Sequence, residues 1–421
     1  MNRLSDLFLL VRRSLRQHAL STTITVLAIA LASGLVMSVF IIKDQAYSAF
    51  TGGAIGYDAV LGARGSQLQL VLNTIFHLET SPGNLPWEMY ETVANDPRVE
   101  LAIPYAVGDN YRGFRIVGTT EDIFSKFEYQ RGKNFQVQAG GRFFDHKRRE
   151  AVIGSFVAQR TRLTLGARFN AYHGLAFDEN KQHDEQYVVA GILQPTNTPS
   201  DRVIWIPLEG IFRMGGHVLR GSGNEYQAQP GEAIPEEHQE VSAVMLKFKS
   251  PQEGFALDQT INKQGKVATL AWPIGRVMAE WFDKLGWMVR VLELVAYLVA
   301  LVAAGSILAS IYNTINERRR EFAILRALGA QRQIIFSALI LEAATIAALG
   351  SICGYFVYAA IQTVAAKIMR TQTGVVLEVF AFNPAFVFVP IGMILLGALA
   401  GWLPASKAYR TDVATNLVPQ S

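Results

Sequence analysis

The 421-residue sequence contains a single cysteine, Cys353, and this scarcity excludes two kinds of structure. One thiol cannot form a disulfide within the chain, and zinc sites built from several cysteines are excluded as well. The phosphate-binding pattern Gly-x-x-x-x-Gly-Lys-[Ser/Thr] is missing, so we expect no nucleotide-binding loop and no cofactor in this chain. His-Glu-x-x-His, Gly-x-Ser-x-Gly and Cys-x-x-Cys are also missing. The sequence therefore predicts no catalytic residues and indicates a protein that is not itself an enzyme.

Charge is missing from four long stretches, and each is long enough to cross a bilayer, which requires about 20 apolar residues. These stretches are residues 19–42, 294–316, 343–366 and 379–406. The first is too long for the apolar part of a typical signal peptide and lacks an obvious cleavage site. We therefore interpret it as an uncleaved anchor and predict a multi-pass membrane protein with four transmembrane helices.

The loop charges orient these helices. Residues 1–18 carry four arginines against one acidic residue, and the segment 316–332 carries five arginines against two. The segment 43–290, by contrast, has 26 basic and 28 acidic residues. By the positive-inside rule, both termini and the segment 316–332 lie in the cytoplasm, and the large segment lies outside. Because this rule already explains the basic character of the chain, we expect no nucleic-acid partner.

The external segment shows mixed α/β signals. A short helix is predicted over 87–95. Alternation of apolar and polar residues predicts four strands, at 114–118, 151–153, 187–193 and 203–206. Residues 215–240 are rich in Gly, Gln, Glu and Pro, which is typical of a mobile insertion. From about 272 the pattern becomes helical and runs into the second apolar stretch, as a stalk would.

Two histidines of this segment are candidate metal ligands. His173 and His183 lie beside four acidic residues, namely Asp178, Glu179, Asp184 and Glu185. A solvated polar loop explains the same composition, and we favour it, so no metal site is assigned. Glu293 and Glu342 stand at the edges of apolar stretches, where a partner at a helix end suffices to explain them.

The segment 317–330 reads Glu-Arg-Arg-Arg-Glu-Phe-Ala-Ile-Leu-Arg-Ala-Leu-Gly-Ala and follows the second apolar stretch. With four spans and a large external domain between the first two, it resembles the FtsX/MacB/LolC family of mechanotransmitting (type VII) ABC transporter permeases. The external domain is similar to the MacB-like periplasmic core domain at 118–119, 141–144, 151–154, 165–166, 188–193 and 201–208. The tail 404–410 is also similar, although the proline common three residues later is Asp412 here or missing.

This resemblance implies a permease subunit of the bacterial inner (cytoplasmic) membrane. Two permease subunits, here favoured as a homodimer, would pair with two copies of a cytosolic ATP-binding subunit that binds ATP and Mg²⁺. ATP hydrolysis there would drive movement of the periplasmic domain. The implied tasks are lipoprotein release, driving an efflux adaptor, or activating a periplasmic enzyme, so a periplasmic protein or lipoprotein is a further expected partner.

The resemblance also implies that the segment 316–332 is a coupling helix seated in the ATPase. Arginines and glutamates there offer charge-assisted hydrogen bonds, and the leucines and isoleucine offer an apolar stripe suited to a groove. The expected coupling residues are Glu317, Arg318, Arg319, Arg320, Glu321, Ile324, Leu325, Arg326, Leu328 and Gly329. From the residues alone, anchoring of the arginines to anionic membrane lipid is an equal alternative.

The predicted fold class is therefore an α-helical membrane domain of four transmembrane helices, with a large mixed α/β periplasmic domain between helices 1 and 2. The boundaries are 1–18 amphipathic N-terminal segment, 19–43 helix 1, 44–283 periplasmic core domain, 284–315 stalk and helix 2, 316–332 coupling helix, 333–366 helix 3, 367–383 periplasmic loop, 384–406 helix 4 and 407–421 cytoplasmic tail. An alternative from another functional class is an ATP-independent membrane receptor or scaffold with a periplasmic binding domain.

Overall fold

The computed structural model describes residues 3–52, 56–174, 177–214, 234–327 and 329–410. The chain divides into two compact units. Unit 1 comprises Met1–Ala46, Leu285–Lys367 and Leu377–Ser421, and unit 2 comprises Tyr47–Lys284 and Ile368–Val376.

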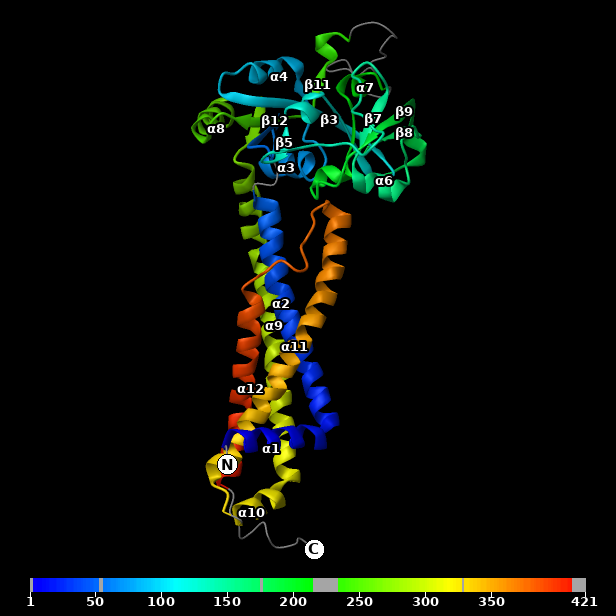
Figure 1. Cartoon of the computed structure of the whole chain (residues 1–421). Helices are drawn as coiled ribbons and strands as arrows, with labels where there is room; N and C mark the ends of the chain where they lie inside the picture. Colours follow the sequence, from blue (N-terminus) through cyan, green and yellow to red (C-terminus); the bar gives the residue numbers. More distant parts are fainter. Residues whose placement is uncertain (1–2, 53–55, 175–176, 215–233, 328, 411–421) are drawn as a thin grey trace. The chain divides into compact units, whose positions relative to one another are not determined.

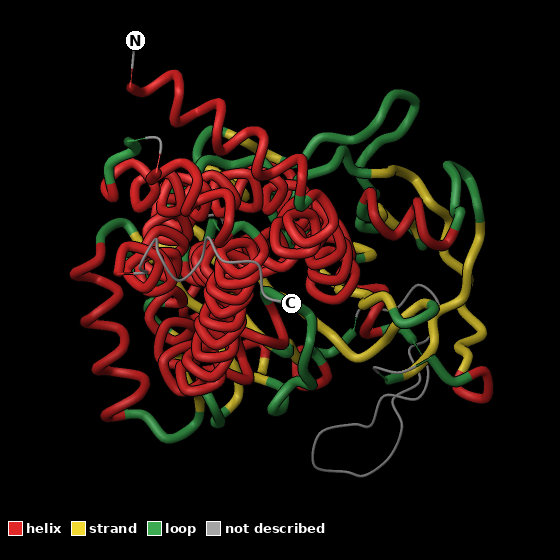
Figure 2. Tube along the Cα trace, turned by 90° about the horizontal axis from the view of Figure 1, so that it is seen from below, coloured by secondary structure: helices red, strands yellow, loops and turns green. Residues whose placement is uncertain are grey.

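Unit 1 is built from helices. They are α1 (Arg3–Gln17), most of α2 (Ala19–Thr51), most of α9 (Ile274–Glu317), α10 (Arg319–Ala327), most of α11 (Arg332–Thr373) and α12 (Ala385–Arg410). Four of them, α2, α9, α11 and α12, are long and apolar enough to cross a membrane. Figure 2 shows the long helices nearly end-on, where they form a bundle. The four predicted membrane helices are thus confirmed.

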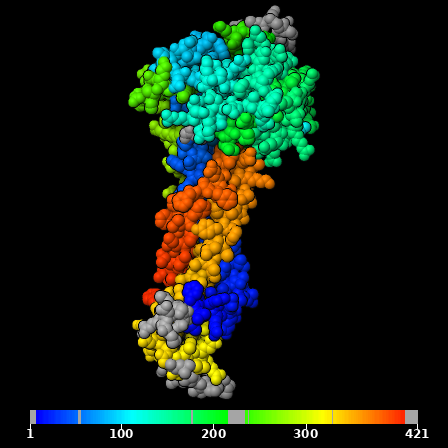
Figure 3. Space-filling model, in the orientation of Figure 1, coloured from blue at the N-terminus to red at the C-terminus, as the bar shows by residue number. Residues whose placement is uncertain are grey.

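Small residues set the close packing of the bundle. A Cβ atom added at Gly350 of α11 would lie 2.5 Å from the Cβ of Ile29 on α2, and one at Gly397 of α12 would lie 2.6 Å from the Cβ of Ala347. Such short approaches are available only to glycine. They pack α2 and α12 against α11 within one chain, and Figure 3 shows α11 and α12 side by side on one face.

The third membrane helix is longer than the sequence predicts. Helix α11 continues to Thr373, so the first seven of the 17 residues expected as a loop at 367–383 are helical. Lys367 ends the uncharged stretch but does not end the helix, because lysine, methionine and arginine all favour helical backbone. A charge boundary therefore marks the edge of the apolar segment and not the helix end.

Unit 2 is mixed α/β, as predicted, and its strands all lie between α2 and α9 in the chain. The strands are β1 (Ala59–Ala63), β2 (Leu85–Pro86), β3 (Val99–Tyr111), β4 (Phe114–Thr119), β5 (Glu128–Gln130), β6 (Lys133–Asn134), β7 (Glu150–Ile153), β8 (Arg168–His173), β9 (Gln182–Ile192), β10 (Ile204–Pro207), β11 (Glu240–Val241), β12 (Ala243–Phe248) and β13 (Ala268–Ala271). The α-helices that accompany them are α3 (Gln67–Thr74), α4 (Trp87–Ala94), α5 (Asp122–Ser125), α6 (Ser155–Thr161), α7 (Leu208–Phe212) and α8 (Pro251–Asp258). The helix expected at 87–95 and all four expected strands are confirmed.

Nine strands form one sheet in the order β13-β1-β12-β3-β4-β10-β7-β9-β8. The long strand β3 belongs to two parts of it. Its first half pairs with β12, while its second half pairs with β4 on one side and β8 on the other. The pairing of β3 with β8 closes the strands from β3 to β8 into a barrel-like ring. A register shift between Val107 and Asp109 bends β3 where it changes partners.

Both faces of the open part of the sheet are covered. Strand β1 is buried at four consecutive positions, so side chains on either face pack against other elements. Helices α3 and α4 lie on the two sides of these strands in Figure 1.

Of the insertion expected at 215–240, residues 215–233 lie outside the described residues. Its end forms a short turn at Glu236–His238 and then begins β11, which pairs with β2.

Candidate functional site

The segment predicted as one coupling helix, 316–332, has a different form. It holds the last residues of α9, the separate nine-residue helix α10 (Arg319–Ala327), a turn and the first residue of α11. The turn ends α10 with a Schellman motif: Ala330 N–H donates to the Leu325 carbonyl at 3.0 Å, and Gly329 N–H donates to the Arg326 carbonyl at 3.0 Å. Gly329 has φ +98°, a left-handed conformation that favours glycine. This glycine therefore reverses the chain between α10 and α11.

Arg318 occupies the corner between α9 and α10 and is directed toward its own chain. It is 9% exposed, its Nε donates to Glu321 Oε2 at 2.8 Å, and its guanidinium lies 5.1 Å from the centre of the Phe322 ring. Ala323 is also buried. Arg318 was predicted to bind a partner; in this structure its guanidinium contacts Glu321 and Phe322 of α10, and its backbone N–H donates to the Thr314 carbonyl of α9 at 3.1 Å. Arg318 therefore links α9 to α10, and its binding to a partner stays a prediction.

The remaining side of α10 is exposed, and it includes Glu321, which also accepts the hydrogen bond from Arg318. Arg320 and Glu321 are exposed, Ile324 is 44% exposed, and Leu325 and Arg326 are half-buried. Of the remaining predicted residues, Glu317 is exposed, Gly329 lies in the turn, Leu328 lies outside the described residues, and the side chain of Arg319 is not described. The structure thus presents a charged surface with one apolar side chain at its centre, which we call the α10 face: Arg320, Glu321 and Ile324.

Helix α1 and His18, the residue that follows it, contact the helices that flank α10. Ser14 Oγ donates to Glu342 Oε1 of α11 at 2.6 Å, and His18 Nδ1 lies 2.9 Å from Glu317 Oε2 at the end of α9. Glu342 is 3% exposed. The acidic residue at the other apolar edge, Glu293, forms an ion pair with Lys43 of α2 at 2.8 Å. Both intramembrane acids accordingly have the partners that a structural role requires.

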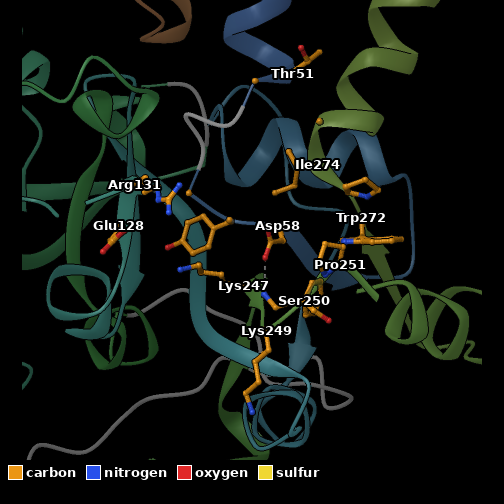
Figure 4. A pocket seen from close by; sticks show the side chains of 16 residues that line it. Thr51, Asp58, Glu128, Arg131, Lys247, Lys249, Ser250, Pro251, Trp272 and Ile274 are labelled. Carbon is orange, nitrogen blue, oxygen red and sulfur yellow. Dashed lines mark hydrogen bonds between the residues drawn. The ribbon is translucent and has the colours of Figure 1, made fainter. Parts of the chain in front are cut away.

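Unit 2 contains a cavity of about 660 Å³ (Figure 4). Lys247, Lys249 and Arg131 line it together with Asp58 and Trp272. Asp58 has a structural role, because its Oδ2 accepts a hydrogen bond from the Phe248 N–H at 2.8 Å. This cavity was not predicted, since its lining comes from distant strands and the start of α9.

Several aromatic side chains line a smaller cavity of about 170 Å³ in unit 2. Tyr57 stacks on Phe127 with ring centres 4.0 Å apart, and His77 meets Trp205 edge-on. Within the described part of the chain, the Nδ1 of His77 and the Nε1 of Trp205 are buried and have no hydrogen-bond partner. Burial, with a smaller effect of Arg115 and Arg202, lowers the pKa of His77 from 6.5 to about 3.

Two of the histidines considered as metal ligands do come together. His173 Nδ1 and His183 Nε2 lie 3.3 Å and 3.1 Å from the same atom, Oδ1 of Asp109. Asp109 was missed, because nothing in the local sequence connects it to residues 64 or more positions away. Asp178, by contrast, caps a short turn by accepting the Asn180 N–H at 3.1 Å.

Comparison with known proteins identifies both halves of the chain. Residues 22–262 match the model of the MacB-like periplasmic core domain family, and residues 293–413 match that of the FtsX-like permease C-terminal family. A curated relative is the ABC transporter permease YtrF of Bacillus subtilis, 28% identical over 134 residues. That alignment covers 29% of this chain and 30% of the relative, so the chain spans about a third of that protein's length.

Two solved structures are similar to part of the chain. The periplasmic region of MacB from Actinobacillus actinomycetemcomitans has a TM-score of 0.34 at 10% identity, covering 55% of this chain and 94% of that one. The extracellular domain of the noncanonic ABC-type transporter YknZ from Gram-positive bacteria has a TM-score of 0.28 at 14% identity, covering 50% and 97%. Because the periplasmic core model alone covers more than half of the residues, and the permease model covers the membrane helices after it, this chain belongs to the MacB/FtsX-type family of ABC transporter permeases.

Proposed function

We propose that this protein is the membrane subunit through which a separate cytosolic ATPase moves a periplasmic domain. In this proposal the α10 face binds the ATPase, and unit 2 works on the outer side of the inner membrane. Both termini are cytoplasmic. The observation that carries the proposal is the position of α10: it connects α9 to α11, and Arg318 at the corner bonds the Thr314 carbonyl of α9 while its side chain contacts α10.

Continuity of the backbone supports transmission of movement. Helix α9 is one uninterrupted element of 44 residues, Ile274–Glu317, whose first residues belong to unit 2 and whose last residues reach α10. Helix α2 likewise runs from unit 1 into unit 2. Because an α-helix is stiff along its axis, a displacement of α10 is passed on by α9 instead of being absorbed by a loop.

The α10 face suits a protein groove better than a lipid surface. It carries Arg320 and Glu321 of opposite sign and an exposed Ile324 between them. An acidic residue is repelled by anionic lipid, whereas mixed charges around one apolar anchor are typical of a protein interface. Two copies of the ATPase and a second copy of this chain complete the proposed assembly.

Co-purification from the native membrane with mass spectrometry tests the proposal. The wild-type chain is compared with Ile324→Asp, which places a charge in the centre of the α10 face. A matched control is Val267→Asp, a substitution at an equally apolar side chain of unit 2 that is 58% exposed. We expect an ATP-binding subunit with the wild type and the control, and its loss with Ile324→Asp. Absence of any ATPase in the wild-type sample would instead favour the ATP-independent receptor.

A further inference from the structure

The cluster of Asp109, His173 and His183 combines three side chains that the topology of unit 2 brings to one point. Asp109 lies in β3 directly opposite His173, the last residue of β8, in their antiparallel pairing. His183 lies near the start of β9, which pairs with β8. The cluster therefore sits where β3, β8 and β9 meet at the closure of the ring.

The ligand atoms have the separations that a metal ion requires. His173 Nδ1 and His183 Nε2 lie 3.3 Å and 3.1 Å from Asp109 Oδ1, and the ligand atoms all lie within 4.8 Å of one another. Zinc binds histidine nitrogen and carboxylate oxygen at about 2.0–2.2 Å in a tetrahedral arrangement, which places ligand atoms roughly 3.3 Å apart. Two of the three separations already have about this value, and the third, between the two imidazole nitrogens, is no more than 4.8 Å.

Two asparagines hold the backbone around the cluster. Asn110 Nδ2 donates to the carbonyls of Tyr172 and Gly174, the two neighbours of His173, at 3.2 Å and 2.9 Å. Asn170 Nδ2 donates to the carbonyl of His183 itself at 3.1 Å. Supporting bonds of this kind fix the position of ligands and are a regular part of metal sites. The positions of both histidines are thus set independently of any contact between their rings and Asp109.

Burial is graded across the cluster. The side chain of Asp109 is fully buried and that of His183 is 9% exposed, whereas His173 is 46% exposed. The buried carboxylate of Asp109 attracts a cation strongly, because solvent does not screen its charge. The exposed His173 gives the cluster contact with solvent, from which an ion and a coordinating water can come.

We propose that Asp109, His173 and His183 form a three-ligand site for a divalent first-row transition metal ion, with zinc the best match. The donor set of two imidazoles and one carboxylate is a mixed nitrogen and oxygen set, which disfavours magnesium and calcium. The site belongs to the external domain and is independent of the α10 face. Its presence or absence consequently says nothing about the proposed coupling to an ATPase.

The test uses the full-length protein in detergent, purified through a tag that contains no histidine and stripped with a chelator. Zinc is titrated by calorimetry, and cobalt is added separately because its visible absorption reports tetrahedral coordination. The variants are Asp109→Asn, His173→Gln and His183→Gln. The control is His146→Gln, which alters a histidine 62% exposed in the same unit.

We expect one zinc ion per chain in the wild type and in the control. Removing supporting residues of metal sites typically costs 10–100-fold in affinity, so removing a ligand should weaken zinc binding by at least about 100-fold. Because Asp109 is buried, Asp109→Asn can impair folding, and the surface substitution His173→Gln then decides the matter. No zinc bound by the wild type at micromolar concentrations, or equal binding by His173→Gln, would overturn the proposal.

Discussion

Ser14 of α1 donates a 2.6 Å hydrogen bond to Glu342 of α11, a carboxylate that is 3% exposed within the helical bundle. The two residues are 328 positions apart, so this bond joins the start of the chain to its third membrane helix. A buried carboxylate that loses its donor is costly, because no solvent replaces the bond. The amphipathic helix α1 is therefore held by a specific polar contact as well as by its apolar side chains.

Ser14→Ala should lower the stability of unit 1 by about 1–3 kcal/mol, the usual cost of leaving a buried acceptor without its donor. Thermal unfolding in detergent measures the change, and hydrogen exchange of α1 localises it. Thr23→Ala is the matched control, because the Thr23 hydroxyl is exposed and bonds only the Ala19 carbonyl one turn away. An equal effect of both substitutions would show that the Ser14–Glu342 bond is not the cause.

Substitutions at Arg318 and Arg320 should distinguish a side chain that holds α10 in place from one that contacts the ATPase. Arg318→Ala removes the bond to Glu321 and the stacking on Phe322, together worth about 1–2 kcal/mol at this partly exposed site. We expect faster amide exchange over 319–327 and weaker recovery of the ATPase. Arg320→Ala should weaken recovery while leaving amide exchange unchanged, because Arg320 is exposed. If Arg318→Ala leaves the exchange rates of α10 unaltered, Arg318 does not position this helix.

Substitution by alanine should change the stability of the membrane helices at one glycine, Gly350, and not at another, Gly305. Gly350→Ala places a Cβ atom 2.5 Å from the Cβ of Ile29, so α2 and α11 must separate at a cost of about 1–3 kcal/mol. Beyond its own turn of helix, Gly305 of α9 has no described atom within 4 Å of its added Cβ position, and alanine is the better helix former there. Unfolding of the isolated chain in detergent should show a loss for Gly350→Ala and no loss for Gly305→Ala. The reverse order would contradict the packing described for α2 against α11.

Local patterns predicted a large part of this fold. The membrane helices follow from uncharged stretches, and strands such as β4 and β10 follow from short runs of β-branched and aromatic residues. The length of α11 was underestimated because hydropathy reports the membrane edge, whereas helical backbone continues through Lys367 to Thr373. These errors concern boundaries, where local signals compete.

The relations between distant residues were not predictable in the same way. Pairing of β3 with β8 depends on the bend between Val107 and Asp109, and no periodicity in the sequence predicts this bend. The same closure brings Asp109 to His173 and His183. For the segment 316–332, composition predicted candidate coupling residues, and these stay a prediction. It did not predict the orientation of Arg318 toward Glu321 and Phe322, because that orientation depends on the corner between α9 and α10.

The buried imidazole of His77 should make unit 2 sensitive to acid. In the folded chain its pKa is lowered from 6.5 to about 3, mainly by burial, so the folded state keeps this side chain neutral. Below pH 6.5 the unfolded chain takes up a proton that the folded chain does not bind. Stability is therefore fully present above pH 6.5 and falls as the pH drops toward 3, by up to about 1.4 kcal/mol per pH unit.

His77→Asn should flatten this dependence, since asparagine does not titrate and tolerates the backbone of this position, which has φ +56°. Denaturant unfolding of the full-length protein between pH 5 and 7.5 measures the slope. His146→Asn serves as the control, because its imidazole is 62% exposed and its removal should leave the slope as in the wild type. A slope that survives in His77→Asn would assign the acid sensitivity to other groups, and a wild type without any slope would show that His77 is protonated in the folded chain.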